Sequence, residues 1–299
     1  MKKFLTYAAV AYCVSLIGFT QPTSAVAQSR PTATAEVAAL PDTTATIAAV
    51  PAKAPKVKYV AQTKKWGTLR AKFVVDGKVA DPTKVSAATD PFCAALPPIM
   101  TENLIVGKEG ALKNLAIYLD KKSKTKDIHP DLAKPDATPL KLDNKNCVFV
   151  PHVLFVRPGQ SVDVTNSDQT GHNANFNFFN NEPVNFLVPP GGKKNLPVLK
   201  DEPAPIPVDC NIHNWMRAHV IVQDHPYVGI SGEDGVLEIA NLPVGPVTLR
   251  VWHELGTIDE ASVGGKKEKW SKGRMEIEIK EGMNDLGTVK IAAEKFTKK

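Results

Sequence analysis

The chain has 299 residues, with 37 lysines and arginines against 31 aspartates and glutamates, for a formal net charge of +6. This excess is small and evenly spread, which argues against nucleic acid as a partner. Lysines gather at residues 121–126 and 290–299, where solvated loops account for them.

The first 27 residues have the pattern of a secretory signal peptide. Lys2 and Lys3 precede an apolar run over residues 4–19, and an Ala-Val-Ala cleavage pattern ends at Ala27. The run is too short for a comfortable membrane span. We expect an exported protein, periplasmic or extracellular, with no membrane span in the mature chain. Residues 28–64, rich in Ala, Pro and Thr, predict a disordered spacer.

Folded sequence is expected from residue 65 onward, and its pattern is that of an all-β protein. Residues 121–139 show no strand pattern and are rich in Lys, Asp and Pro, which predicts a long surface loop. An Asn-Ser-Asp turn at residues 166–168 leads to His172. The segments with strand character, rich in β-branched and aromatic residues, are residues 68–77, 115–119, 146–156 and 162–164.

The strongest pattern in the chain is a close set of metal-binding residue types, Cys210, His213 and Met216. An extended strand would separate the cysteine from the methionine by roughly 20 Å. Two sulfurs on one ion therefore require the segment to fold back, and Asn211 and Asn214 favour such a turn. We predict a strand end, a tight loop and a second strand.

His172 brings a second imidazole from a distant part of the sequence. Two histidines and a cysteine, with a weak axial methionine, are the donor set of a mononuclear copper site of the electron-transfer kind. Zinc fits less well, because thioether sulfur is a poor match for its ligand preferences. A dinuclear copper centre would need a second nearby cysteine, which the loop lacks.

These motifs resemble the cupredoxin family of blue-copper proteins, of the amicyanin and plastocyanin type. The short Cys-x-x-His-x-x-Met loop and the strand, Asn-Ser-Asp turn and His-Asn sequence carry the resemblance, which covers residues 141–224 well and 66–120 loosely. It implies one copper ion and second-shell roles for Asn173 and Trp215. A common variant of the family has proline after the second histidine, where this chain has Asn214. The implied copper ligands are His172, Cys210, His213 and Met216.

The resemblance implies one-electron transfer to an unidentified redox partner protein, with the electron leaving through the more solvent-accessible imidazole, His213. No substrate pocket or acid–base pair is needed, so we expect no enzyme activity. Two alternatives stay open: a periplasmic copper carrier or storage protein, and a metal-free extracellular binding module on a degenerate cupredoxin scaffold. The chain is also similar to bacterial cupredoxin-type proteins described as methylamine-utilisation-like, but nothing in its residues recognises an amine or a quinone.

The remaining cysteines are candidates for a disulfide. Cys13 falls in the signal peptide and Cys210 in the copper motif, which leaves Cys93 and Cys147 as a possible pair in an oxidising compartment. Alternatively, Cys147 and His152 form an accessory metal site. A buried structural role is the more common one for such a histidine, and equally for the others outside the motif, His129, His219, His225 and His253.

Residues 225–299 predict a second, smaller β-sandwich after a cupredoxin-like domain at 65–224. Three strand patterns between residues 227 and 252 are separated by Gly-rich turns. The Asp-Gly-x-x-x-Ile-x-x-Leu-Pro-x-Gly sequence at 234–245 resembles carboxypeptidase-regulatory or transthyretin-like sandwiches, which says little about function. The predicted fold is thus a Greek-key cupredoxin β-sandwich followed by a transthyretin-like β-sandwich. His253-Glu254 suggests zinc, but no second histidine lies at helical spacing.

Overall fold

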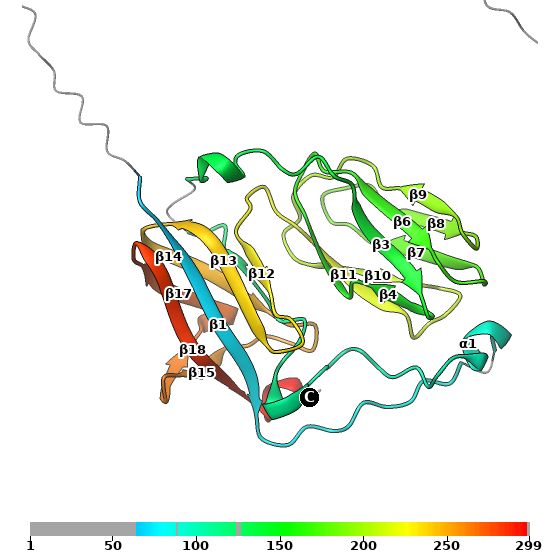
Figure 1. Cartoon of the computed structure of the whole chain (residues 1–299), viewed down its shortest axis with the longest axis horizontal. Helices are drawn as coiled ribbons and strands as arrows, with labels where there is room; N and C mark the ends of the chain where they lie inside the picture. Colours follow the sequence, from blue (N-terminus) through cyan, green and yellow to red (C-terminus); the bar gives the residue numbers. More distant parts are fainter. Residues whose placement is uncertain (1–63, 88, 124–126, 298–299) are drawn as a thin grey trace, which may run out of the picture. The chain divides into compact units, whose positions relative to one another are not determined.

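A computed structural model describes residues 64–87, 89–123 and 127–297. The predicted signal peptide (1–27) and residues 28–63 of the predicted spacer lie outside these ranges. The prediction of an all-β fold is confirmed, since the described residues build four sheets (Figure 1). Their helices are a short α1 (Pro91–Ala95) and the 3₁₀ turns Lys108–Gly110, Pro130–Leu132, Ser271–Gly273 and Ala293–Phe296.

The first sandwich carries the predicted copper ligands. Two sheets enclose its core, in which Leu142 and Val164 of one sheet pack in the same cluster as Phe176 and Val208 of the other. One sheet has the order β5 (Val153–Val156), β11 (Arg217–Val222), β10 (Ile206–Asp209), β7 (His172–Phe176), β8 (Val184–Val188). The other has the order β4 (Val148–Val150), β3 (Leu140–Lys145), β6 (Val162–Asn166), β9 (Lys193–Asn195).

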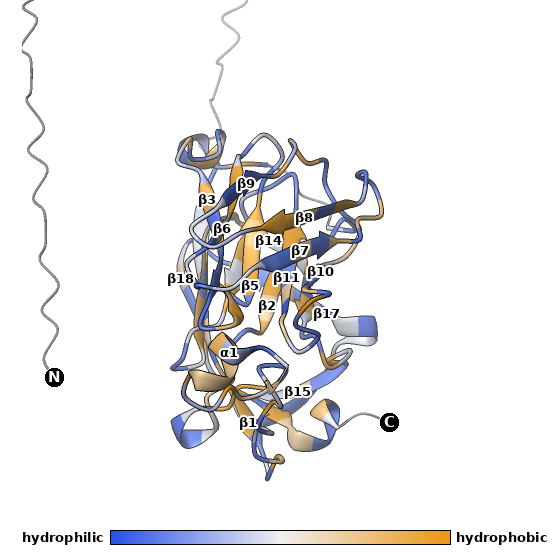
Figure 2. Cartoon of the chain, turned by 90° about the vertical axis from the view of Figure 1, so that its right-hand side faces the viewer, coloured by the Kyte–Doolittle hydropathy of each residue, from blue (hydrophilic) through white to orange (hydrophobic). Residues whose placement is uncertain are grey.

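The second sandwich is built in the same way around its own core. Strand β2 (Ala116–Leu119) is buried along its whole length and is among the most hydrophobic in Figure 2. One sheet has the order β13 (Val236–Pro243), β1 (Trp66–Asp76), β18 (Gly282–Ala292), β15 (Glu260–Val263), β16 (Lys266–Lys269). The other has the order β12 (Val228–Ile230), β2 (Ala116–Leu119), β14 (Gly245–Trp252), β17 (Arg274–Ile279).

The structure corrects the predicted domain boundary between residues 224 and 225. Strands β1 and β2, which we assigned to the cupredoxin-like domain at 65–224, belong to the second sandwich. Strand β1 lies between β13 and β18, and β2 lies between β12 and β14. The alternation in β1 places Leu69, Ala71 and Phe73 in the second core. A strand pattern shows which residues face a core, but not which of two cores they face.

Between β1 and β2 the chain runs out to the first sandwich and back. Residues 85–99, which include α1, contribute Cys93 and Ile99 to the first core, with Phe92 and Leu96 packed against it. We call residues 82–87 and 89–101 the cap segment. It brings residues that are distant in sequence close to the predicted copper ligands.

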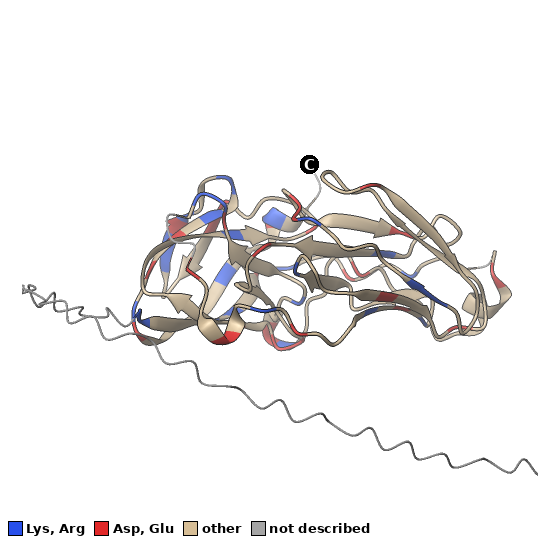
Figure 3. Ribbon diagram, turned by 90° about the horizontal axis from the view of Figure 1, so that it is seen from above, with Lys and Arg blue, Asp and Glu red and all other residues tan. Residues whose placement is uncertain are grey.

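The two sandwiches meet through a small apolar cluster. Ala116 and Tyr118 of β2 pack with Val153 of β5 and Ile221 of β11. Charged residues of both signs are interspersed over the strands and loops (Figure 3), as the even charge distribution predicts. None of the helices in the described ranges has the length and apolar character needed to span a bilayer.

Candidate metal centre

The loop between β10 and β11 folds back on itself, as the sequence predicts. The Cys210 amide donates to the Met216 carbonyl at 3.1 Å, and the Met216 amide donates to the His213 carbonyl at 2.9 Å. Strand β10 ends at Asp209 and β11 begins at Arg217, so the turn holds the cysteine and the methionine side by side in the backbone. His172 opens β7, which pairs with β10.

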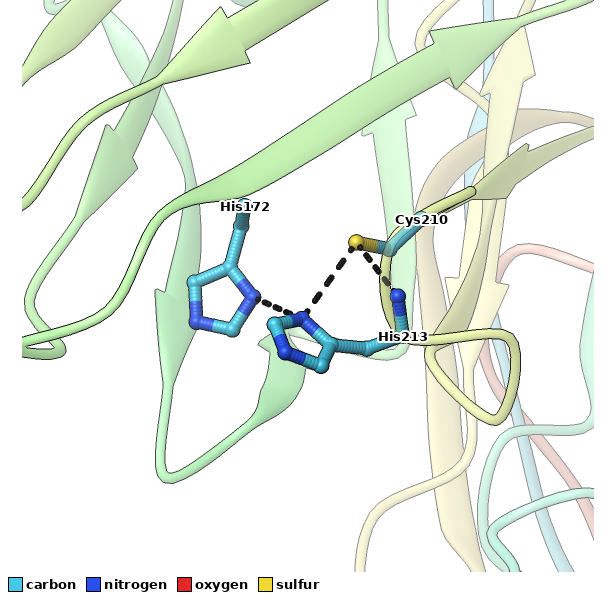
Figure 4. Close-up of side chains that lie close together, drawn as sticks. All are labelled: His172, Cys210 and His213. Carbon is cyan, nitrogen blue, oxygen red and sulfur yellow. Dashed lines mark hydrogen bonds between the residues drawn. The ribbon is translucent and has the colours of Figure 1, made fainter. Parts of the chain in front are cut away.

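The two imidazoles and the thiol converge (Figure 4). The Nδ1 atoms of His172 and His213 lie 2.9 Å apart, and Nδ1 of His213 lies 3.7 Å from Sγ of Cys210. One donor atom from each of the three residues lies within 4.8 Å of the others. All three are buried, and Met216 is buried in the same core cluster as Cys210.

A carboxylate engages the far side of each imidazole. Nε2 of His172 lies 3.0 Å from Asp168, and Nε2 of His213 lies 3.1 Å from Asp90. A proton on Nε2 that donates to the carboxylate leaves the Nδ1 lone pair free, and this is how protein metal sites commonly fix the tautomer of a ligating histidine. The carboxylates thus leave a free lone pair on each Nδ1. These two lone pairs face the space beside the Cys210 sulfur, where they can bind a metal ion.

Two Nδ1 lone pairs only 2.9 Å apart repel unless a proton or a cation lies between them. Burial lowers the pKa of His172, and the neighbouring His213 lowers it further, which together outweigh the raising effect of Asp168. The neutral imidazole is the form that binds a metal. The arrangement therefore fits a copper ion held by His172, His213 and Cys210, with Met216 adjacent.

Asn173 ties the two ligand segments together. Its Oδ1 accepts hydrogen bonds from the amides of Asn211 at 2.7 Å and Ile212 at 3.2 Å, and the Cys210 thiol donates to it at 3.5 Å. The His213 amide in turn donates to the Cys210 sulfur at 3.4 Å. These contacts connect β7 to the loop that carries Cys210 and His213.

Trp215, the other predicted second-shell residue, covers one side of the site. Its ring centroid lies 5.1 Å from that of His213, and its Nε1 donates to the Cys147 carbonyl at 3.1 Å. Cys147 is joined to Cys93 by a disulfide that connects the cap segment to the first sandwich. Because Cys147 is disulfide-bonded, it offers no thiolate for the alternative accessory site with His152.

Asp90 and Asp168 are the site residues that sequence reasoning missed. Asp90 is the N-cap of α1: its Oδ1 accepts from the Cys93 amide at 2.9 Å, and its Oδ2 contacts both His213 and the Thr170 hydroxyl. Asp-Pro at the start of a helix is a recognisable capping pattern. Nothing local, however, shows that this carboxylate meets a histidine 123 residues away.

Hydrogen bonds hold the Asp90 carboxylate ionised. Burial raises its pKa, but the Cys93 amide, the Thr170 hydroxyl and His213 outweigh burial and lower the pKa of Asp90 to about 2. A negative charge therefore stands directly behind the His213 imidazole. It compensates part of the positive charge that a bound metal ion brings into the buried site.

The structure corrects one expectation about the site. His213 is only 1 % exposed, so it is not the solvent-accessible edge that the family resemblance implies. Asp90 of the cap segment and Trp215 of the loop cover it. The cap segment lies more than 100 residues upstream in the chain, so the loop sequence could not reveal this cover.

No protein-family model and no curated protein matches the sequence. Among solved structures, a copper-containing nitrite reductase from Thermus scotoductus SA-01 is 22 % identical over 32 % of this chain and 27 % of its own, with a TM-score of 0.28. A purple cupredoxin from Nitrosopumilus maritimus is 19 % identical over 28 % of this chain and 99 % of its own, with a TM-score of 0.24. An oxidised amicyanin variant is 18 % identical over 31 % and 89 %, with a TM-score of 0.26. Each of these structures matches about a third of this chain, and this chain spans about a quarter of the nitrite reductase.

Proposed function

We propose that this chain is an exported copper protein that transfers single electrons, with one copper ion held by His172, Cys210, His213 and Met216. One observation carries the proposal: both histidines turn Nδ1 toward the cysteine sulfur while carboxylates engage both Nε2 atoms. Copper in a two-histidine, cysteine and methionine site accepts and gives up one electron.

The protein contributes rigidity to this function. Asn173 fixes the loop that carries Cys210 and His213, while Asp168 and Asp90 fix the two imidazole planes. Burial excludes water from the donors. Ligands held in place before the metal binds need little movement when its charge changes, and the proposed function requires no substrate pocket.

The redox partner is expected to approach over Ile212 and Leu187. These side chains are 51 % and 63 % exposed, although both are large and apolar. Both adjoin Asn173: the Ile212 amide donates to its side chain, and Leu187 pairs with it across β7 and β8. Ile212 directly precedes His213 and lies two residues after Cys210, so this apolar surface gives a partner protein a short route to the centre.

Export is supported by the leader pattern at residues 1–27 and by the disulfide between Cys93 and Cys147. Disulfides of this kind persist in oxidising compartments and are rare in the cytosol. A free cysteine, Cys210, remains buried in the same sandwich.

Reconstitution with Cu²⁺ tests the proposal. We expect an intense thiolate-to-copper absorption band and a reversible one-electron potential, both lost in Cys210→Ser. His129→Gln changes a histidine that contacts Trp66 of the second sandwich and serves as a matched control, which should keep the band. A colourless protein that takes up no copper would contradict the proposal. Rapid loss of copper to a weak chelator would favour a carrier or storage role instead.

A further inference from the structure

A second cluster of potential metal ligands lies where the two sandwiches meet. His152 precedes β5, His219 lies in β11, and Glu254 follows β14. The His219 amide donates to the His152 carbonyl at 2.8 Å, and Nε2 of His152 lies 2.5 Å from the Glu254 carboxylate. One donor atom from each of the three residues lies within 4.8 Å of the others.

Two buried ring nitrogens of this cluster form no hydrogen bond with any described residue. Nδ1 of His152 and Nδ1 of His219 are both buried without a hydrogen-bond partner, and each residue is only 7 % exposed. Buried polar atoms in folded proteins nearly always have partners, so each exception needs an explanation. The unpartnered Nδ1 of His219 points to a ligand, because its ring contacts that of His152, with centroids 5.9 Å apart, beside the Glu254 carboxylate.

An ion pair explains why the His152 ring is buried here, but it does not explain the burial of His219. Its Nε2 faces Glu254, and the Glu102 carboxylate lies 3.8 Å from its Nδ1, so a protonated His152 would be well compensated. Among the described residues, no carboxylate forms a hydrogen bond or an ion pair with His219, whose ring packs against Trp252 with centroids 4.9 Å apart. A structural ion pair therefore leaves a second buried imidazole beside it unexplained.

We propose that His152, His219 and Glu254 form a second metal site, for a divalent transition-metal ion that prefers imidazole and carboxylate ligands, such as Zn²⁺. Two imidazoles and one carboxylate are a common protein ligand set for such ions. The Glu102 carboxylate lies 3.8 Å from Nδ1 of His152, on the side of the ring away from Glu254, and adds a second negative charge near the site.

The site is separate from the copper centre and shares a strand with it. His219 lies three residues after Met216, a separation of roughly 10 Å along an extended chain. Its ligands come from both sandwiches, since β5 and β11 belong to the first and β14 to the second. A bound ion would link the two sandwiches beside the apolar cluster of Tyr118, Val153 and Ile221.

Zn²⁺ titration of the full chain, by calorimetry, tests the site. Cys210→Ser removes the thiolate of the copper centre, and we expect one Zn²⁺ to bind in this background and to raise the unfolding temperature. Glu254→Gln and His219→Gln, each in the same background, should weaken binding at least about 100-fold, because even the loss of an outer partner costs about 10–100-fold. Glu276→Gln, which changes an exposed glutamate of β17, is the matched control and should bind Zn²⁺ unchanged.

Co²⁺ provides a readout of ligand type. The Cys210→Ser protein loaded with Co²⁺ should show d–d absorption without a thiolate band, and Glu254→Gln should lose it. Circular dichroism and thermal unfolding establish that each variant is folded. No Zn²⁺ uptake by folded Cys210→Ser protein, or uptake unaffected by Glu254→Gln, would overturn the proposal. The copper band of the unmodified chain is measured separately, so a failure here does not bear on the copper centre.

Discussion

At the scale of single residues, Asn173 is the side chain that connects the two segments that carry the proposed ligands. It accepts from two loop amides and from the Cys210 thiol, and its own amide donates to Asn185 at 2.8 Å. A typical hydrogen bond contributes about 0.5–1.5 kcal/mol to stability, so the two loop amides together account for about 1–3 kcal/mol. The residue therefore links the stability of the sandwich to the geometry of the site.

Asn173→Ala should destabilise the protein by about 1–3 kcal/mol, because the Asn211 and Ile212 amides lose their acceptor. Copper should also leave the variant faster, since the ligand loop is less constrained. Urea unfolding and the rate of copper loss to a chelator measure the two effects. Asn177→Ala, at an exposed position after β7, should change stability by less than about 0.5 kcal/mol. Equal effects of the two substitutions would contradict this account.

At the scale of elements, the cap segment closes the site from outside the sandwich. It is attached at one point by the Cys93–Cys147 disulfide, which spans 54 residues of sequence, and at another by the Asp90 contact with His213. The covalent link lies three residues from Asp90 and restrains its position beside the imidazole. We therefore expect the cap segment to limit access to the buried donors.

Replacing both Cys93 and Cys147 by Ala should destabilise the protein by about 4 kcal/mol, the loop-closure value for a cross-link of this span. Copper should exchange with a chelator faster, while the absorption band should keep its position because the proposed ligands are intact. Urea unfolding and stopped-flow chelation measure these effects. An unchanged exchange rate would mean that the cap segment does not limit access.

Strands β2, β14 and β17 are joined by a buried carboxylate. Asp120, at the end of β2, lies 2.9 Å from Arg250 of β14 and 3.0 Å from Arg274 of β17. Burial raises the pKa of Asp120, but the Lys122 amide and the two guanidinium groups outweigh burial, so the pKa lies below its usual value. An ionised Asp120 therefore stabilises the second sandwich.

The sign of the pH effect follows from that lowered pKa. The stabilisation by Asp120 is fully present above its ordinary pKa of about 3.9 and is lost as the pH falls through the lower value in the folded protein. Asp120→Asn should therefore cost about 1.5–3 kcal/mol at pH 7, and the difference from the unmodified chain should shrink below pH 4. Thermal unfolding across this pH range measures it, with Asp81→Asn, at an exposed site, as the control. A difference that stays constant with pH would contradict the role of the charge.

At the scale of the whole molecule, the chain passes from one sandwich to the other more than once. Within the described residues, the chain begins in the second sandwich with β1, reaches the first through the cap segment and returns as β2. It then builds the first sandwich from β3 to β11 before completing the second from β12 to β18. Each sandwich core is thus closed by segments that are far apart in the sequence.

A chain that ends at residue 224 should not fold into a stable copper-binding domain. It would expose Leu69 and Phe73 of β1, because the neighbours β13 and β18 would be missing. We expect low solubility and loss of native near-UV circular dichroism relative to the full chain. A soluble fragment with the same copper band as the full chain would show that the first sandwich is independent.

The sequence alone was sufficient to predict those features whose determining residues are neighbours in the chain. The Cys210, His213 and Met216 loop could be predicted because its ligand types, spacing and turn-forming asparagines lie within seven residues. The alternation of Val162 and Val164, buried as in a half-buried strand, likewise appears in the pattern itself. His172 lies further away, and only the resemblance to a known family connected it with this loop.

Only the tertiary structure decided the features that depend on long-range pairing. The partners of β1, the cover over His213 by Asp90, and the meeting of His152, His219 and Glu254 all join segments that are remote in sequence. Periodicity shows which side of a strand faces a core, but several cores and many partners satisfy the same pattern. Composition and spacing thus determined an all-β chain with one compact ligand loop. The three-dimensional packing determined which charged residues surround this loop and which residues form the second cluster.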